Sequence, residues 1–174
     1  MSHILMKKWS ELEEQLKVHR SNLNRDTLFK ILQQWSLEVK KIKDKRVQEL
    51  YNTYLEYFED YSSIDAKVTP WYSLKEIIDI ELLNRPPITY DRTIIKVRDV
   101  LWDLLVFKSN ERCPCCGDDN LRVMREAEDE VLLLTCDLCG CILDTSGEKR
   151  SIKGKLFPAP VPMIKSAGIS ENPV

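Results

Sequence analysis

The sequence has few residues that interrupt helices and few that carry catalytic chemistry. Five glycines in 174 residues leave little material for tight turns, which favours long helices. The two histidines, His3 and His19, do not have the spacing of a metal site. The G-x-S-x-G, H-E-x-x-H and P-loop motifs of hydrolases and phosphotransferases are also missing. These absences predict a protein that is not an enzyme. The alternative is an enzyme in which a metal-binding module has a purely structural role.

Long hydrophobic runs are missing as well. No apolar stretch approaches the roughly 18–20 residues that span a bilayer, so we expect no membrane partner. The N-terminus has no basic start followed by an apolar segment, which argues against a secretory signal. Six cysteines without such a signal favour a reducing, cytoplasmic location and metal binding over disulfides.

Apolar side chains at helical spacing are present throughout residues 1–108. Between Leu5 and Leu16 they recur at steps of three and four residues, which places them on one face of a helix. Residues 94–105 are apolar over more than half of a helix circumference, so we expect the most buried helix there. The pattern predicts a helical domain at 1–108.

The stretch from Leu28 to Tyr61 has two sets of helically spaced apolar residues. A phase slip separates the sets near residues 43–46, and neither glycine nor proline marks it. We therefore expect one long, curved helix. A break between two helices is the alternative.

Four cysteines form two C-x-x-C-G units: Cys113 with Cys116, and Cys136 with Cys139. The 19 residues between the units match the spacing of zinc sites. Two thiolates from one tight turn supply one edge of the tetrahedron that Zn²⁺ prefers, and the glycine after each pair permits a positive backbone φ. Four thiolates close the coordination shell, so the pattern predicts structural Zn²⁺.

An iron–sulfur cluster or a redox site is the alternative use of four cysteines. Cys115 and Cys141 fall outside the zinc pattern, and either could replace a neighbouring ligand. We expect these two thiols to be bystanders rather than redox-active groups.

Strand-like segments surround the cysteines at 121–127 and 130–135, with Glu128 and Asp129 as the hairpin turn, and a third strand is expected at 141–145. Two cysteine knuckles joined by short strands resemble a zinc ribbon. The resemblance covers residues 109–145, about a fifth of the chain, and implies a metal and a local fold without specifying a function.

Residues 146–174 contain four prolines and no helical periodicity, so we expect an extended tail close to polyproline II. The expected fold class is therefore mainly α. It consists of the helical domain 1–108, a small β zinc ribbon at 109–145, and the extended tail at 146–174.

Charge is unevenly distributed. Residues 109–145 carry nine acidic and three basic side chains, and a zinc centre with four thiolates adds a charge of about −2. An acidic module repels phosphates and attracts cationic surfaces. We expect a protein partner with a basic surface, with Tyr57 as an exposed aromatic anchor and with six acidic contact residues: Asp118, Asp119, Glu126, Glu128, Asp129 and Glu130.

A small, acidic binding protein without catalytic machinery resembles, in profile, the immunity proteins that neutralise bacterial toxins. That resemblance implies a basic toxin, often a nuclease, as the partner; other adaptor roles share the same profile. The alternative function is nucleic-acid or transcription-associated binding, because zinc ribbons are common there. A basic segment near the C-terminus favours this alternative: Lys149, Arg150, Lys153 and Lys155.

Overall fold

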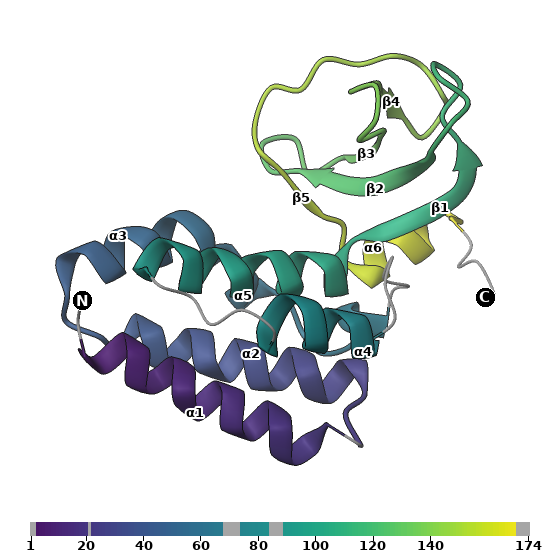
Figure 1. The fold of residues 1–174 in the computed structure, drawn as a ribbon. Coiled ribbons are helices and arrows are strands. Elements are labelled where there is room, and N and C mark those ends of the chain that lie inside the picture. Colours follow the sequence, from purple (N-terminus) through teal and green to yellow (C-terminus); the bar gives the residue numbers. More distant parts are fainter. Residues whose placement is uncertain (1–2, 21, 68–73, 84–88, 170–174) are drawn as a thin grey trace. The chain divides into compact units, whose positions relative to one another are not determined.

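The computed structural model describes residues 3–20, 22–67, 74–83 and 89–169, and the chain forms two compact units. The helical unit comprises residues 1–67 and 71–104, and the sheet unit comprises 68–70 and 105–174. The helices of the first unit are α1 (His3–His19), α2 (Arg25–Lys40), α3 (Lys45–Tyr54), η1 (Glu56–Asp60), η2 (Asp65–Lys67), α4 (Leu74–Glu76), η3 (Ile77–Leu83) and α5 (Tyr90–Leu105), whose last residue already belongs to the second unit. The second unit contains β1 (Phe107–Arg112), β2 (Asn120–Glu126), β3 (Leu132–Thr135), β4 (Ile142–Asp144), β5 (Leu156–Pro158) and α6 (Val161–Ser166) (Figure 1).

In the helical unit, α1 and α2 run side by side in opposite directions (Figure 1). The predicted apolar face of α1 is buried, with Leu5 and Leu16 fully enclosed. Trp9 of α1 contacts Trp35 of α2 edge to face, with ring centroids 6.3 Å apart. The Trp35 indole N–H donates to the Lys8 carbonyl at 2.8 Å, so this buried polar group is paired. No helix among the described residues has the length and apolarity to cross a membrane.

The prediction of one long helix across residues 28–61 is wrong. Helix α2 ends at Lys40, and α3 begins after Asp44, whose carboxylate accepts from the amides of Arg46 and Val47 at 3.0 and 3.2 Å. The Gln48 side chain also donates to the Lys40 carbonyl at 2.6 Å. An aspartate N-cap therefore restarts the helix where neither glycine nor proline is present.

Helix α5 confirms the prediction of a strongly buried helix at 94–105. Its apolar face is essentially removed from solvent, with exposures of 1% or less for Ile94, Val97, Val100, Leu101, Leu104 and Leu105. These side chains form one broad stripe because they recur at three- and four-residue steps.

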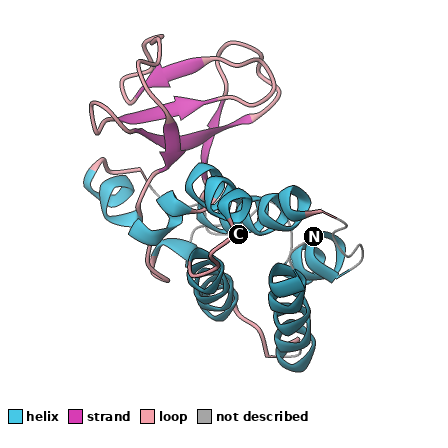
Figure 2. Ribbon diagram, turned by 90° about the vertical axis from the view of Figure 1, so that its left-hand side faces the viewer, coloured by secondary structure: helices cyan, strands magenta, loops and turns pink. Residues whose placement is uncertain are grey.

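The fold class is mixed α/β, which corrects the expectation of a mainly α protein. The sheet unit contains a five-stranded antiparallel sheet with the order β1-β2-β3-β4, and β5 pairs with β2 (Figure 2). Strands were correctly predicted at β2, β3 and β4. Strand β1 was missed because its first residues continue the apolar pattern of α5. It pairs with the first part of β2, and β5 pairs with the last part.

The expectation of an extended tail at 146–174 is wrong for the helix α6, and residues 170–174 lie outside the described residues. It holds locally at Pro160, whose φ of −63° and ψ of 144° are close to polyproline II. Strand β5 adds to the sheet, and α6 follows it after Pro160. Pro162 lies in the first turn of α6, where a backbone amide has no acceptor within the helix, so the missing N–H of proline costs no hydrogen bond. The apolar side chains of this segment complete the core of the sheet unit, which includes Phe107, Val123, Leu134, Leu143, Ala159, Val161 and Ile164.

Candidate metal centre

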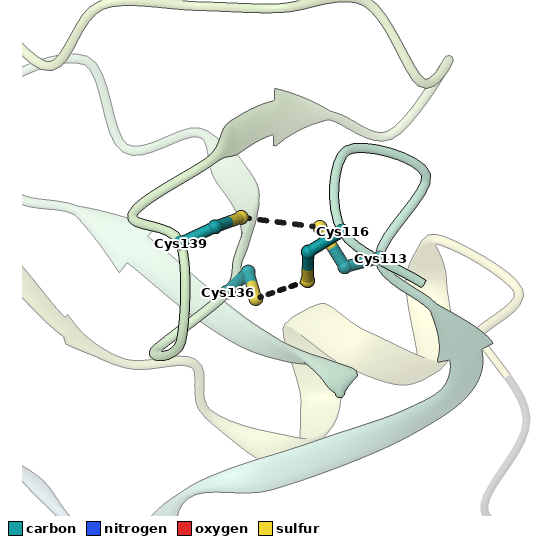
Figure 3. A group of neighbouring side chains, drawn as sticks. All are labelled: Cys113, Cys116, Cys136 and Cys139. Carbon is teal, nitrogen blue, oxygen red and sulfur yellow. Dashed lines mark hydrogen bonds between the residues drawn. The ribbon is translucent and has the colours of Figure 1, made fainter. Parts of the chain in front are cut away.

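Each C-x-x-C-G unit forms a turn between two strands. The first turn joins β1 to β2, and the second joins β3 to β4. The Gly117 amide donates to the Cys113 carbonyl at 2.8 Å, and the Gly140 amide donates to the Cys136 carbonyl at 3.0 Å. Both glycines have positive φ, 74° and 69°. The two turns therefore share one local geometry and present their cysteines towards each other (Figure 3).

The structure brings together the sulfurs of Cys113, Cys116, Cys136 and Cys139, all within 4.8 Å of one another. Cys113 Sγ lies 3.6 Å from Cys139 Sγ, and Cys116 Sγ lies 3.7 Å from Cys136 Sγ (Figure 3). Zinc–sulfur bonds of about 2.3 Å in a tetrahedron require sulfurs about 3.8 Å apart. The sulfur group can therefore hold a tetrahedral metal ion without a large rearrangement.

The surroundings of the sulfurs favour thiolate at some positions and oppose it at others. Burial raises the pKa of the Cys113 thiol, but hydrogen bonds from the backbone amides of Cys116 and Cys115, together with those of the Cys139 and Cys136 side chains, outweigh it and lower this pKa to about 7. At Cys139 the amide of Cys141 lowers the pKa, but desolvation and the neighbouring thiols raise it to about 12. A cation that replaces the remaining protons relieves this conflict, so metal binding here releases protons.

The positive φ of Gly140 gives a prediction. An alanine Cβ at this position would meet no atom within 4 Å, so the cost of Gly140→Ala is conformational, about 1 kcal/mol. We expect Gly140→Ala to weaken metal binding about 5- to 10-fold in competition with a chelator, because 1.4 kcal/mol corresponds to about a tenfold change. Gly140→Asn should lose less, since asparagine tolerates the left-handed region. Equal losses for the two variants would contradict this explanation.

Cys115 and Cys141 differ from the expectation of two bystander thiols. The structure joins them as a disulfide with a Cα–Cα distance of 6.5 Å, so the expectation of metal binding without disulfides is wrong for this pair. Neither residue belongs to the group of four sulfurs. The sulfurs of Cys115, Cys141 and Cys113 nevertheless lie within 4.8 Å of one another, so the pair adjoins the metal site.

The predicted acidic surface divides into paired, buried and exposed residues. Asp118 and Glu128 are exposed. A hydrogen bond from Lys108, against a smaller opposing effect of burial, lowers the pKa of Asp119. Three of the six carboxylates form ion pairs within the chain: Asp119 with Lys108 at 2.6 Å, Asp129 with Lys153 at 2.7 Å, and Glu130 with Arg125 at 3.2 Å.

Glu126 has a structural position that sequence reasoning missed. Its side chain is 2% exposed, so its carboxylate is not presented to a partner. One oxygen accepts from the backbone amides of Lys153 and Gly154, the latter at 3.1 Å. These bonds hold the segment that leads into β5. The sequence signal for this junction is an acidic segment at 126–130 followed by a basic one at 149–155, because opposite charges favour contact between the two segments. The ion pair of Lys153 with Asp129 is one such contact.

Tyr57 is half-buried rather than fully exposed. Its ring lies 4.1 Å from that of Phe58 and 6.4 Å from that of Trp102, centroid to centroid. Desolvation raises the pKa of its hydroxyl. The structure thus places Tyr57 within an aromatic group of the helical unit.

Comparisons with known proteins add no relative. No family model, no curated protein and no solved structure matches this chain. In particular, no family match supports the resemblance to toxin-immunity proteins. The cysteine cluster that can hold a metal ion is therefore the feature on which a functional assignment depends.

Proposed function

We propose that this protein is a non-enzymatic binding protein whose sheet unit is held by a structural Zn²⁺ and binds a protein partner with a basic surface. The spacing of the four cysteine sulfurs supports the metal assignment. Thiolate ligands suit Zn²⁺, and four of them leave no open coordination position for a substrate. The ion, when bound, would supply cross-linking of the two knuckles rather than catalysis.

Metal analysis of the purified full-length chain tests the zinc assignment. We expect one Zn²⁺ per chain, and a thiolate-to-metal absorption band after replacement by Co²⁺. Cys116→Ser should reduce the bound zinc, whereas Cys115→Ser serves as the matched control because Cys115 is outside the group of four. Iron with inorganic sulfide, or no metal in chain purified without chelator, would overturn the assignment.

The partner proposal depends on the charge around the knuckles. Asp118 is exposed in the first knuckle segment, and Leu138 in the second is 65% exposed. Glu128 adds an exposed carboxylate at the β2–β3 hairpin, and a four-thiolate zinc centre adds about −2. A cationic surface with an apolar contact complements this set of groups. A basic toxin, as bound by immunity proteins, is one partner of that class.

Binding of a labelled arginine-rich peptide tests the charge complementarity. We expect salt-dependent binding, because exposed charges are screened beyond about 10 Å at 0.1 M salt. The double variant Asp118→Asn with Glu128→Gln should bind the peptide several-fold more weakly at low salt. Glu14→Gln on the exposed surface of α1 is the matched control.

A labelled oligonucleotide distinguishes the alternative function. Nucleic-acid binding depends steeply on salt because phosphate contacts release counterions. The exposed Lys149 and Lys155 are the groups that would contact phosphates. Binding of the oligonucleotide with no binding of the peptide would replace the protein-partner proposal with the nucleic-acid one.

A further inference from the structure

The disulfide and the four-sulfur site connect the same two turns. Cys115 lies between two ligands in the first knuckle, and Cys141 follows the second knuckle immediately before β4. The Cα–Cα distance of 6.5 Å lies within the range that a disulfide can bridge. The Cys136 amide donates to the Cys141 carbonyl at 2.9 Å, which fixes the position of Cys141 relative to the second knuckle. The disulfide therefore joins the same two turns that a bound metal ion would join.

The two members of the pair differ in access to solvent. Cys115 is exposed, whereas Cys141 is half-buried and packs against the core of the sheet unit. A small molecule can therefore reach the Cys115 sulfur more easily than the Cys141 sulfur. The Cys141 sulfur is adjacent to that of Cys115, so it can react with a mixed disulfide formed there.

We propose that Cys115 and Cys141 are a thiol–disulfide exchange site for low-molecular-weight disulfides, separate from the metal ligands. The Cys115 thiolate attacks the small disulfide, which forms a mixed disulfide and releases one small thiol. The Cys141 thiolate then attacks the Cys115 sulfur and releases the second small thiol. Two protein S–H groups become one S–S bond, the small disulfide is reduced to two thiols, and the two protein protons pass to the released thiolates.

This chemistry leaves Cys113, Cys116, Cys136 and Cys139 available to the metal. Oxidation of the pair closes a loop with a sequence separation of 26 residues. Closing such a loop restricts the unfolded chain and is expected to reduce the unfolding equilibrium constant of the metal-free sheet unit on the order of 100-fold. The oxidised sheet unit would therefore keep its knuckles together after metal loss, whereas the reduced unit would not.

Titration of the full-length, metal-loaded chain with mixtures of reduced and oxidised glutathione tests the proposal. We expect alkylation and peptide mass spectrometry to show loss of the Cys115 and Cys141 thiols and formation of their disulfide, with the metal content unchanged. After addition of a chelator, the oxidised sample should retain amide protection in the sheet unit that the reduced sample loses. Metal release together with the first oxidised thiols would overturn the proposal, as would full alkylation of both residues in oxidised glutathione.

Single variants test the order of attack. Cys141→Ser should accumulate one glutathione on Cys115, because the second step is removed. Cys115→Ser should accumulate glutathione on Cys141 at least about tenfold more slowly, since Cys141 is half-buried. Equal rates would overturn the assigned order. A chain that binds no zinc but still forms this disulfide would refute the proposed metal assignment alone, so the two failures are distinguishable.

Discussion

Under reducing conditions, Cys136→Ser should unfold the sheet unit and leave the helical unit folded. Cys136 is 2% exposed and belongs to both the sulfur group and the apolar core. A structural zinc site contributes about 10–16 kcal/mol to the folding of a small module. A unit of about 70 residues has a stability of only a few kcal/mol without such a support. Hydrogen exchange by mass spectrometry should show lost amide protection across residues 107–169 and little change in α1 and α2.

The control separates loss of the metal from loss of a cysteine. Cys115→Ser removes a sulfur outside the group of four, and under reducing conditions it should retain zinc and amide protection. Removal of the metal from the wild-type protein by a chelator, also under reducing conditions, should reproduce the Cys136→Ser pattern. Unchanged amide protection in the sheet unit of Cys136→Ser would contradict a structural role for the metal.

Glu126→Ala should destabilise the sheet unit by about 2–4 kcal/mol, because each of two hydrogen bonds to a charged acceptor contributes about 1.5–3 kcal/mol and water can partly replace them. The buried carboxylate accepts from the amides of Lys153 and Gly154. The Ala127 amide also donates to the Lys155 carbonyl at 3.0 Å, so β5 depends on this junction. The expected result is a lower urea midpoint for the sheet unit, with faster amide exchange at residues 153–158.

Two other substitutions give this prediction its specificity. Glu126→Gln keeps one acceptor oxygen and should lose less stability than Glu126→Ala. Glu128→Ala, two residues along the chain and exposed, should change stability by less than about 0.5 kcal/mol. If Glu128→Ala were as destabilising as Glu126→Ala, the buried carboxylate would not be the cause.

The features that could be predicted from sequence are those set by neighbouring residues. The buried stripe of α1 follows from side chains three and four positions apart, and the hairpin between β2 and β3 follows from polar residues between apolar runs. The two cysteine turns follow from the C-x-x-C-G pattern, since Gly117 and Gly140 permit the positive φ that each turn requires.

The features that were missed depend on contacts between distant residues. The proline-rich sequence of β5 is typical of polyproline II, yet Pro158 is tolerated in this strand because β5 is an edge strand that, within the described part of the chain, pairs with β2 alone. Glu126 resembles a surface acid until the amides of Lys153 and Gly154 are placed beside it. The pairing of Cys115 with Cys141 likewise requires the knuckles to be positioned first, because the residues are 26 positions apart.

The position of β5 after the cysteine turns in chain order has a consequence for synthesis on the ribosome. All four cysteines of the sulfur group that can hold a metal ion precede residue 140, whereas the strand that completes the β2 edge begins at Leu156. The emerging chain can therefore bind a metal while the second half of β2 still has an open edge, a template for pairing with another chain. Metal binding and protection of that edge are therefore separated in time, and the interval ends only when β5 has emerged from the exit tunnel.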